Sequence, residues 1–204
     1  MKQPLLNALS LIENIYDSAM YDNGDMFRIK DIVHSLSSNQ ISSKEWLAYE
    51  FKKQYYYSAG KILILGGWYG LLAYCLRQRF PREDMNIVSI DKDPMCENIA
   101  WKLFPDIDAK FITADSFDFD MSNYSAIIST SVEHIEQEFW TNIIKEKEKN
   151  TWVCLQSNNY FDHPTHINCS QSVSDFVEGL NIDWVGYQGA IDNHAFQRFM
   201  VIGK

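Results

Sequence analysis

Short apolar runs that alternate with helix-length segments are the feature that most constrains the fold of this chain. The first run, Lys61 to Leu65, is followed at once by two glycines. Continuous apolar runs of this length are typical of strands that are buried on both faces of a sheet. Further strand candidates lie at residues 86–90, 109–113, 125–129, 151–156, 182–188 and 196–202. The alternation predicts an α/β fold, with an open, mostly parallel sheet and helices on both faces.

The last two strand candidates lie too close together for a helix between them. Parallel neighbours need a crossover connection of a dozen or more residues. We therefore expect an antiparallel pair at one edge of the sheet, joined by a turn over residues 189–194 and ending in an antiparallel C-terminal strand.

The segment before the first strand has a helical pattern instead. Apolar residues recur near the helical period over residues 5–20 and again over residues 29–36. Ser42 or Ser43 is placed to cap a third helix. Residues 1–60 are thus expected to form a helical extension or lid.

Composition limits the partners of the chain. A net charge of −9 and a pI near 5.0 disfavour binding to nucleic acid, which depends on many lysine and arginine contacts to phosphate. No apolar stretch approaches the roughly 20 residues that span a bilayer, and the N-terminus does not resemble a secretory signal. The cysteines form no CxxC pair, which favours reduced thiols and a cytoplasmic protein; they are Cys75, Cys96, Cys154 and Cys169.

Glycines and acids follow three successive strand candidates. The first strand ends in a turn that contains Gly66, Gly67 and Gly70, where glycine lets the backbone approach a ligand closely. The second ends at Asp91, whose carboxylate can accept both hydroxyls of a ribose. The third ends in a segment whose acid can accept hydrogen bonds from an adenine amino group; it contains Asp115 and Ser116. A tight turn explains the glycines equally well, and each acid alone is also typical of a helix cap.

Taken together, these segments resemble the Rossmann-like methyltransferases that bind S-adenosylmethionine (SAM). The resemblance covers residues 61–204: residues 61–70 are similar to the glycine-rich first motif of that family, 86–91 to the second, 111–115 to the third and 124–134 to the fourth. It implies a seven-stranded sheet, a SAM-binding domain over 61–204, and SAM as the cofactor. By the resemblance, the three glycines line the methionine portion, Asp91 binds the ribose, and Asp115 faces the adenine; Ser116, next to Asp115, is also a predicted cofactor-binding residue.

The first motif departs from the family at two positions. The family has an acid where this chain has Ile64, and a glycine where it has Trp68. Trp68 can still offer its backbone while its ring packs elsewhere. These departures are the reason to keep a catalytically inactive SAM-binding regulatory or partner subunit as an alternative function.

The fourth strand candidate leads into Glu133 and His134. This pair resembles the EVxEH segment of small-molecule methyltransferases, which also contributes to a metal site in ubiquinone-pathway and small-RNA enzymes; the first acid of that segment is Thr130 here. A histidine with an unperturbed pKa near 6.5 suits a general base. We predict that His134 and Glu133 are catalytic, against the alternative that they only begin and cap a helix.

The segment after the fifth strand candidate is rich in amides, histidines and aromatic rings. Asn158, Asn159 and Tyr160 are predicted acceptor contacts, because amides and phenols can orient a polar substrate; an ordinary polar loop is the alternative. His163 and His166 could join Glu133 and His134 around a metal, but their i, i+3 spacing across Pro164 is not a recognised ligand signature, so no metal site is predicted.

The sequence as a whole predicts a SAM-dependent methyltransferase that modifies an oxygen or nitrogen of a small molecule. Besides the inactive subunit, the alternatives are a nucleic-acid (RNA) methyltransferase and an enzyme that transfers another carbon group from SAM. The acceptor and the oligomeric state do not follow from the residues.

Overall fold

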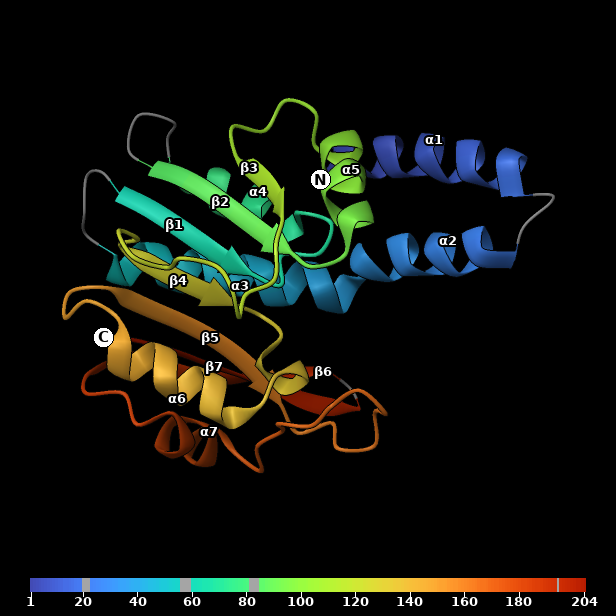
Figure 1. Cartoon of the computed structure of the whole chain (residues 1–204). Coiled ribbons are helices and arrows are strands. Elements are labelled where there is room, and N and C mark those ends of the chain that lie inside the picture. The colour runs from blue at the N-terminus through green and yellow to red at the C-terminus, as the bar shows by residue number, and fades with distance from the viewer. Residues whose placement is uncertain (20–22, 56–59, 81–84, 194) are drawn as a thin grey trace.

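The computed structural model describes residues 1–19, 23–55, 60–80, 85–193 and 195–204. Within these ranges a single seven-stranded sheet has the spatial order β3-β2-β1-β4-β5-β7-β6 (Figure 1). The strands are β1 (Gly60–Leu65), β2 (Met85–Asp91), β3 (Lys110–Thr113), β4 (Ala126–Ser129), β5 (Trp152–Asn158), β6 (Val185–Asn193) and β7 (Phe196–Gly203). The predicted α/β architecture is confirmed.

The antiparallel C-terminal pair is also confirmed. β1 to β5 pair in parallel, whereas β7 runs antiparallel to both β5 and β6. β7 lies between β5 and β6, and β6 forms the edge of the sheet. The expected turn over residues 189–194 is wrong, because β6 continues to Asn193 and pairs with β7 up to Phe196. These backbone pairings outweigh the turn preference of glycine, aspartate and asparagine; His194 lies outside the described residues.

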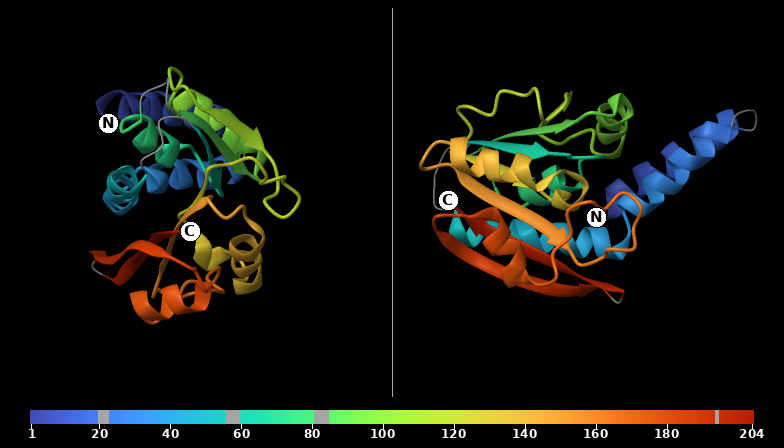
Figure 2. Two further views of the ribbon diagram at one scale, coloured as in Figure 1. Left: turned by 90° about the vertical axis from the view of Figure 1, so that its left-hand side faces the viewer. Right: turned by 60° about the horizontal axis from the view of Figure 1, so that its bottom comes forward.

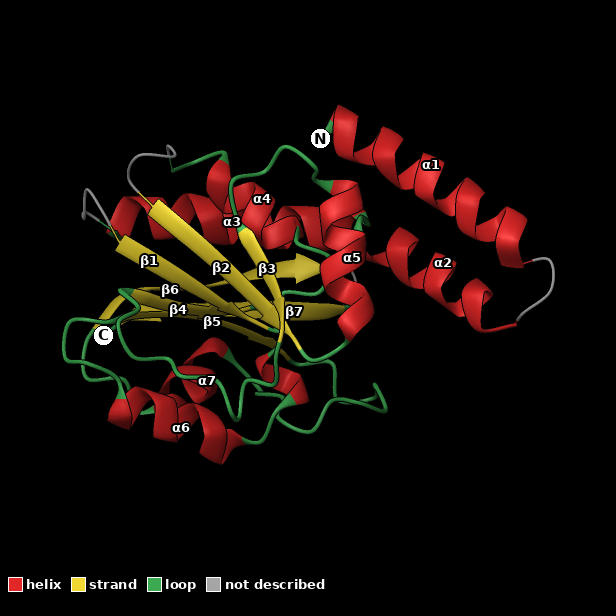
Figure 3. Cartoon of the chain, turned by 45° about the horizontal axis from the view of Figure 1, so that its top comes forward, coloured by secondary structure: helices red, strands yellow, loops and turns green. Residues whose placement is uncertain are grey.

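Helices cover both faces of the sheet (Figure 3). They are α1 (Lys2–Ala19), α2 (Asn23–Ser35), α3 (Ser38–Gln54), α4 (Leu71–Arg77), α5 (Pro94–Leu103), α6 (Gln137–Glu146) and α7 (Val173–Leu180), with a 3-10 turn at Val132–His134. Side chains of β1 alternate between the faces. Ile62 and Ile64 pack in the core with α3, α4 and α5, whereas Leu63 and Leu65 pack with α6 and α7.

The N-terminal helices form two parts. α1 and α2 are an antiparallel pair that projects from the body of the molecule, and α3 lies against the sheet (Figure 2). α3 begins at Ser38, so the expected start at Ser42 or Ser43 is wrong. Ser43 is instead buried inside the helix, where its hydroxyl donates to Gln156 Oε1 on β5 at 2.9 Å. A tertiary contact thus uses the side chain that the sequence pattern assigned to a cap.

Strand order reverses between β1 and β4, the point at which open α/β sheets bind ligands beyond the carboxyl ends of their strands. The turns after β1, β2, β3 and β4 meet at this edge.

All four cysteines are free thiols. Among the described residues, no helix is long and apolar enough to cross a membrane.

Candidate cofactor and acceptor site

The turn after β1 is held in a left-handed backbone conformation. Gly66 has φ +63° and Gly70 has φ +84°, a region that favours glycine because it has no Cβ. A Cβ on Gly66 would lie 2.8 Å from Ser131 Oγ, and one on Gly70 would lie 2.7 Å from the Phe111 ring. Gly66 therefore keeps the turn close to the β4 end, whereas the missing side chain of Gly70 faces the core.

Asp91 joins the turns after β1 and β2. Its Oδ2 accepts a hydrogen bond from the Trp68 backbone N–H at 2.9 Å, and its Oδ1 accepts from the Asp93 N–H at 3.1 Å. The carboxylate is half-buried. Because each carboxylate oxygen has two acceptor sites, both oxygens can still accept a bond from a ligand hydroxyl.

Trp68 occupies the position where the methyltransferase pattern has a glycine, and it has the left-handed φ of +49°. Its backbone N–H bonds to Asp91, while its ring stacks on that of Tyr69, with 5.2 Å between centroids. The indole N–H donates to Asp31 Oδ2 at 3.1 Å, and the ring makes an edge contact with His34, 5.8 Å between centroids. Side-chain anchoring to α2 thus offsets the roughly 1–2 kcal/mol cost of this conformation.

Two charged residues of α2 hold the cofactor-side turns, and we call Arg28 and Asp31 the α2 clamp. Arg28 Nη1 donates to Tyr69 Oη at 2.8 Å and to Asp93 Oδ2 at 2.7 Å, and Tyr69 Oη donates to Asp31 Oδ2 at 2.5 Å. Burial acts to raise the pKa of Asp93, but the hydrogen bonds from Arg28 and from the Met95 N–H, together with the charge of Arg28, outweigh it and lower the pKa. Sequence reasoning missed the clamp, since the i, i+3 spacing of its two residues names no distant partner.

Asp115 and Ser116 follow β3 at the same sheet edge. Asp115 is exposed, and its Oδ1 accepts from the Phe117 N–H at 3.0 Å, which forms a local turn. A cavity of about 620 Å³ begins at Ser116 and extends between the segment after β3 and α6, toward Thr151. Neither the glycine turn nor Glu133 lines this cavity, so its volume alone does not mark the reaction centre.

Glu133 lies at the end of β4, within the 3-10 turn, and is 2% exposed. Its Oε1 accepts from Asn158 Nδ2 at 2.6 Å and from Arg198 Nη2 at 3.3 Å. Arg198 also donates to the Thr130 carbonyl at 3.0 Å. A buried carboxylate is thus paired with a buried guanidinium and connects β4 with β5 and β7. Arg198 is a second residue that sequence reasoning missed.

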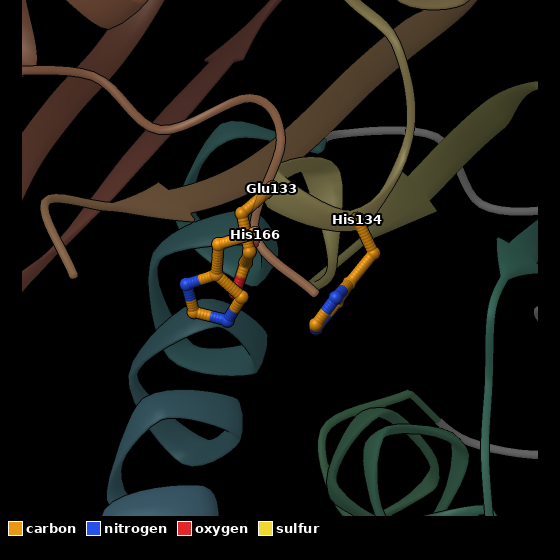
Figure 4. Close-up of side chains that lie close together, drawn as sticks. All are labelled: Glu133, His134 and His166. Carbon is orange, nitrogen blue, oxygen red and sulfur yellow. The ribbon is translucent and has the colours of Figure 1, made fainter. Parts of the chain in front are cut away.

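His134 is exposed beside Glu133, and the loop after β5 brings His166 next to it (Figure 4). The two rings are 4.8 Å apart between centroids. His134 Nδ1 bonds to the Thr165 carbonyl at 3.1 Å, and His166 Nδ1 bonds to the Tyr160 carbonyl at 2.8 Å. Burial is the main cause that lowers the pKa of His166. The ring of His163 lies 4.5 Å from that of His166 between centroids, so the predicted acceptor side has three imidazoles and one buried acid.

The predicted acceptor contacts lie around this cluster. Asn158 is fully buried. Its Nδ2 donates to Glu133 Oε1, and its Oδ1 accepts from the Tyr160 N–H at 2.8 Å. Asn159 Oδ1 accepts from the Gln197 N–H at 2.7 Å, which ties the end of β5 to β7. Tyr160 is partly exposed and stacks on Phe196, with 5.4 Å between centroids. Of the three, Tyr160 has the side chain least occupied by internal bonds.

No protein-family model and no curated protein matches the chain. Solved structures do. Mitomycin 7-O-methyltransferase aligns with 98% of this chain and 68% of its own at 12% identity and TM-score 0.63. Magnesium protoporphyrin IX methyltransferase from Synechocystis aligns with 79% of this chain and 81% of its own at 11% identity and TM-score 0.63. The CurJ carbon methyltransferase aligns with 85% of this chain and 57% of its own at 11% identity and TM-score 0.64.

The chain has a methyltransferase fold. The proteins that share the fold include a 7-O-methyltransferase and a carbon methyltransferase. The fold therefore occurs in enzymes named for different kinds of acceptor atom.

One further charged group of this methyltransferase fold lies buried below the acceptor side. Lys44 of α3 is 6% exposed, and its Nζ donates to Gln40 Oε1 at 2.5 Å. Burial, assisted by the nearby positive charge of Arg198, lowers the pKa of Lys44 from 10.5 to about 7. The amine therefore loses much of its charge near neutral pH.

Replacement of Lys44 by methionine is expected to raise stability more at neutral than at alkaline pH. Between the folded pKa of about 7 and the unfolded value of 10.5, the unfolded chain binds more protons, so stability of the native chain rises with pH. The slope reaches about 1.4 kcal/mol per pH unit for one group. Urea unfolding of both proteins at about pH 7 and about pH 9 measures the difference. A gain that is equal at both pH values would contradict the charge argument.

Proposed function

We propose that this chain is a SAM-dependent methyltransferase that acts on an oxygen or nitrogen atom of a small molecule. The observation that carries the proposal is the position of Asp91. Its two carboxylate oxygens hold the turns after β1 and β2 at the switch point of the sheet, and both keep acceptor capacity for the hydroxyls of a ribose. A nucleoside cofactor is the ligand that this arrangement fits.

The neighbouring turns supply the remaining cofactor contacts in this proposal. Gly66 lets the turn approach Ser131, Gly67 lets it pack against Ser89 of β2, and Gly70 allows it to enter α4, so the methionine portion would bind against a closely packed glycine turn. Asp115 and Ser116 lie at the end of β3, where the adenine would bind. The left-handed turn is preserved even though Trp68 replaces a glycine, which supports retained cofactor binding.

His134 is the proposed acceptor-side group. Methyl transfer forms a bond from the acceptor atom to the methyl carbon and breaks the bond from that carbon to sulfur, and the acceptor loses a proton. The bond between His134 Nδ1 and the Thr165 carbonyl leaves Nε2 with a lone pair that can take this proton. A base is useful for hydroxyl or amine acceptors, which favours oxygen or nitrogen. The net charge of −9 favours a small molecule over nucleic acid.

Calorimetry with SAM and S-adenosylhomocysteine tests the cofactor. We expect micromolar binding that Asp91→Ala weakens at least tenfold, or about 1.4 kcal/mol, because the variant loses both the ribose contact and the support of the turn. Asp183→Ala is the matched control: Asp183 is exposed and lies before β6, at the opposite edge of the sheet. Absence of binding to either molecule would refute the proposal.

Turnover then separates an enzyme from a binding subunit. SAM is supplied with panels of small hydroxyl and amine acceptors, and S-adenosylhomocysteine formation is measured. Tight binding without product on any panel would support the inactive regulatory subunit instead.

A further inference from the structure

Three side chains that can bind a metal ion converge beyond the carboxyl ends of β4 and β5 (Figure 4). Glu133 and His134 come from the 3-10 turn after β4, and His166 comes from the loop after β5. Each offers one ligand atom, and these atoms all lie within 4.8 Å of one another. Backbone bonds fix the two segments together: Ile167 N–H and Asn168 N–H donate to the Glu133 carbonyl at 2.9 and 3.1 Å. The cluster is therefore positioned by the fold.

The two oxygens of the buried acid differ in their hydrogen bonds. Glu133 Oε1 accepts from Asn158 and Arg198, whereas Oε2 is buried and has no hydrogen bond among the described residues. Buried polar atoms are bonded in the great majority of cases, and an anionic oxygen is especially costly to leave alone. Ligating carboxylates are themselves usually hydrogen-bonded, and Oε1 meets that condition here. The free oxygen next to two imidazoles indicates a cation.

The histidines are held in the form that metals bind. A carbonyl oxygen only accepts hydrogen bonds, so Nδ1 of His134 carries a proton to donate to Thr165, and Nδ1 of His166 carries one to donate to Tyr160. In each neutral ring the lone pair is then on Nε2. Metal-ligating histidines almost always use their second nitrogen in this way, since the outer bond fixes both tautomer and ring orientation.

We propose that Glu133, His134 and His166 form a divalent metal site with open coordination positions on the acceptor side. Two imidazoles and one carboxylate suit Zn²⁺ and similar transition metals, whereas Mg²⁺ and Ca²⁺ prefer oxygen ligands. This set of ligands differs from the EVxEH segment in two ways. Thr130 replaces the first acid of that segment, and His166 comes from another loop. The sequence analysis considered His166 beside Glu133 and His134 but predicted no metal, because the spacing of His163 and His166 is not a recognised ligand signature.

In this site His134 is a metal ligand, so it does not act as the general base for the acceptor. A metal held by these residues would act as a Lewis acid toward an oxygen or nitrogen acceptor and would lower its pKa, so that the acceptor would lose its proton to solvent water. Metal binding requires no SAM, and it is thus independent of the proposed methyl transfer. Arg198 shares the charge of Glu133, so we expect micromolar affinity for Zn²⁺.

Calorimetry of the full chain with ZnCl₂, without SAM, tests the site. We expect one Zn²⁺ per chain, with His166→Ala weakening the affinity at least tenfold and Glu133→Gln abolishing binding. Co²⁺ in place of Zn²⁺ provides visible absorption bands that report nitrogen and oxygen ligands directly. MgCl₂ should give no saturable heat.

His163→Ala is the matched control for the metal site. His163 lies in the same loop and contacts Thr165 Oγ1, but it does not belong to the cluster. We expect its affinity for Zn²⁺ to equal that of the native chain. Glu133→Gln is checked for folding by thermal unfolding, because Glu133 also pairs with Arg198; His166 is only partly buried in a loop, and its variant tests the site without that risk. No Zn²⁺ binding, or equal weakening by His163→Ala and His166→Ala, would overturn the proposed ligand set.

Discussion

Replacement of Gly70 by alanine is expected to lower the free energy of unfolding by about 3 kcal/mol. Two costs add. The left-handed φ of +84° disfavours any residue with a Cβ, and the added Cβ would lie 2.7 Å from the Phe111 ring and 3.2 Å from Ala100 Cβ. The buried Phe111 ring belongs to the core beside α5, so it cannot swing aside as an exposed side chain would. Urea unfolding of the two proteins measures the loss.

Gly179 supplies a control for the Gly70 variant within the same chain. It lies inside α7, where a Cβ would approach nothing closer than 3.8 Å. Gly179→Ala should leave stability unchanged or raise it by up to about 1 kcal/mol, since alanine is the better helix former. If both alanine variants had the same stability, the assigned strain at Gly70 would be wrong.

His134→Ala is expected to reduce methyl transfer by about 10² to 10⁴-fold while SAM binding is unchanged. The size follows from either role of the imidazole, because the acceptor proton is lost less readily without a base or without a complete metal site. The ring is exposed, and its partners are in the Thr165 loop, away from the glycine turn. Folding and the cofactor contacts should therefore survive.

Turnover is measured as S-adenosylhomocysteine formation with an acceptor found in the panels, and SAM affinity is measured by calorimetry. Native turnover by His134→Ala would exclude His134 from the reaction in both roles. A parallel loss of SAM affinity would place it on the cofactor side instead.

The strand ends and the glycine turn at the switch point could be predicted from the sequence because their signals are local. The apolar run of β1, the glycines that follow it and Asp91 each lie within one strand and its turn, and the sheet rule brings strand ends together. All the predicted site roles stay predictions: those of Gly66, Gly67, Gly70, Asp91, Asp115 and Ser116 toward the cofactor, of Glu133 and His134 in catalysis, and of Asn158, Asn159 and Tyr160 toward the acceptor. Asn158 and Asn159 lie near the predicted place, but much of their hydrogen-bonding capacity is used inside the protein.

The rest depends on contacts between distant segments. Arg198 reaches Glu133 only because β7 inserts beside β5, and Arg28 reaches Asp93 only because α2 folds back on the turns. No periodicity or spacing encodes such pairs in one sequence. The same is true of His166, whose position next to His134 is set by the course of the loop after β5.

The α2 clamp also bears on the kinetics of turnover. Arg28 and Asp31 hold Tyr69, Trp68 and Asp93, the residues that border the proposed ribose position on either side of Asp91. Product exchange that requires α2 to lift must break these bonds first, and lid movements of this kind occur on microsecond to millisecond timescales and often limit kcat. We therefore expect the α2 clamp to slow the departure of S-adenosylhomocysteine from the proposed cofactor position.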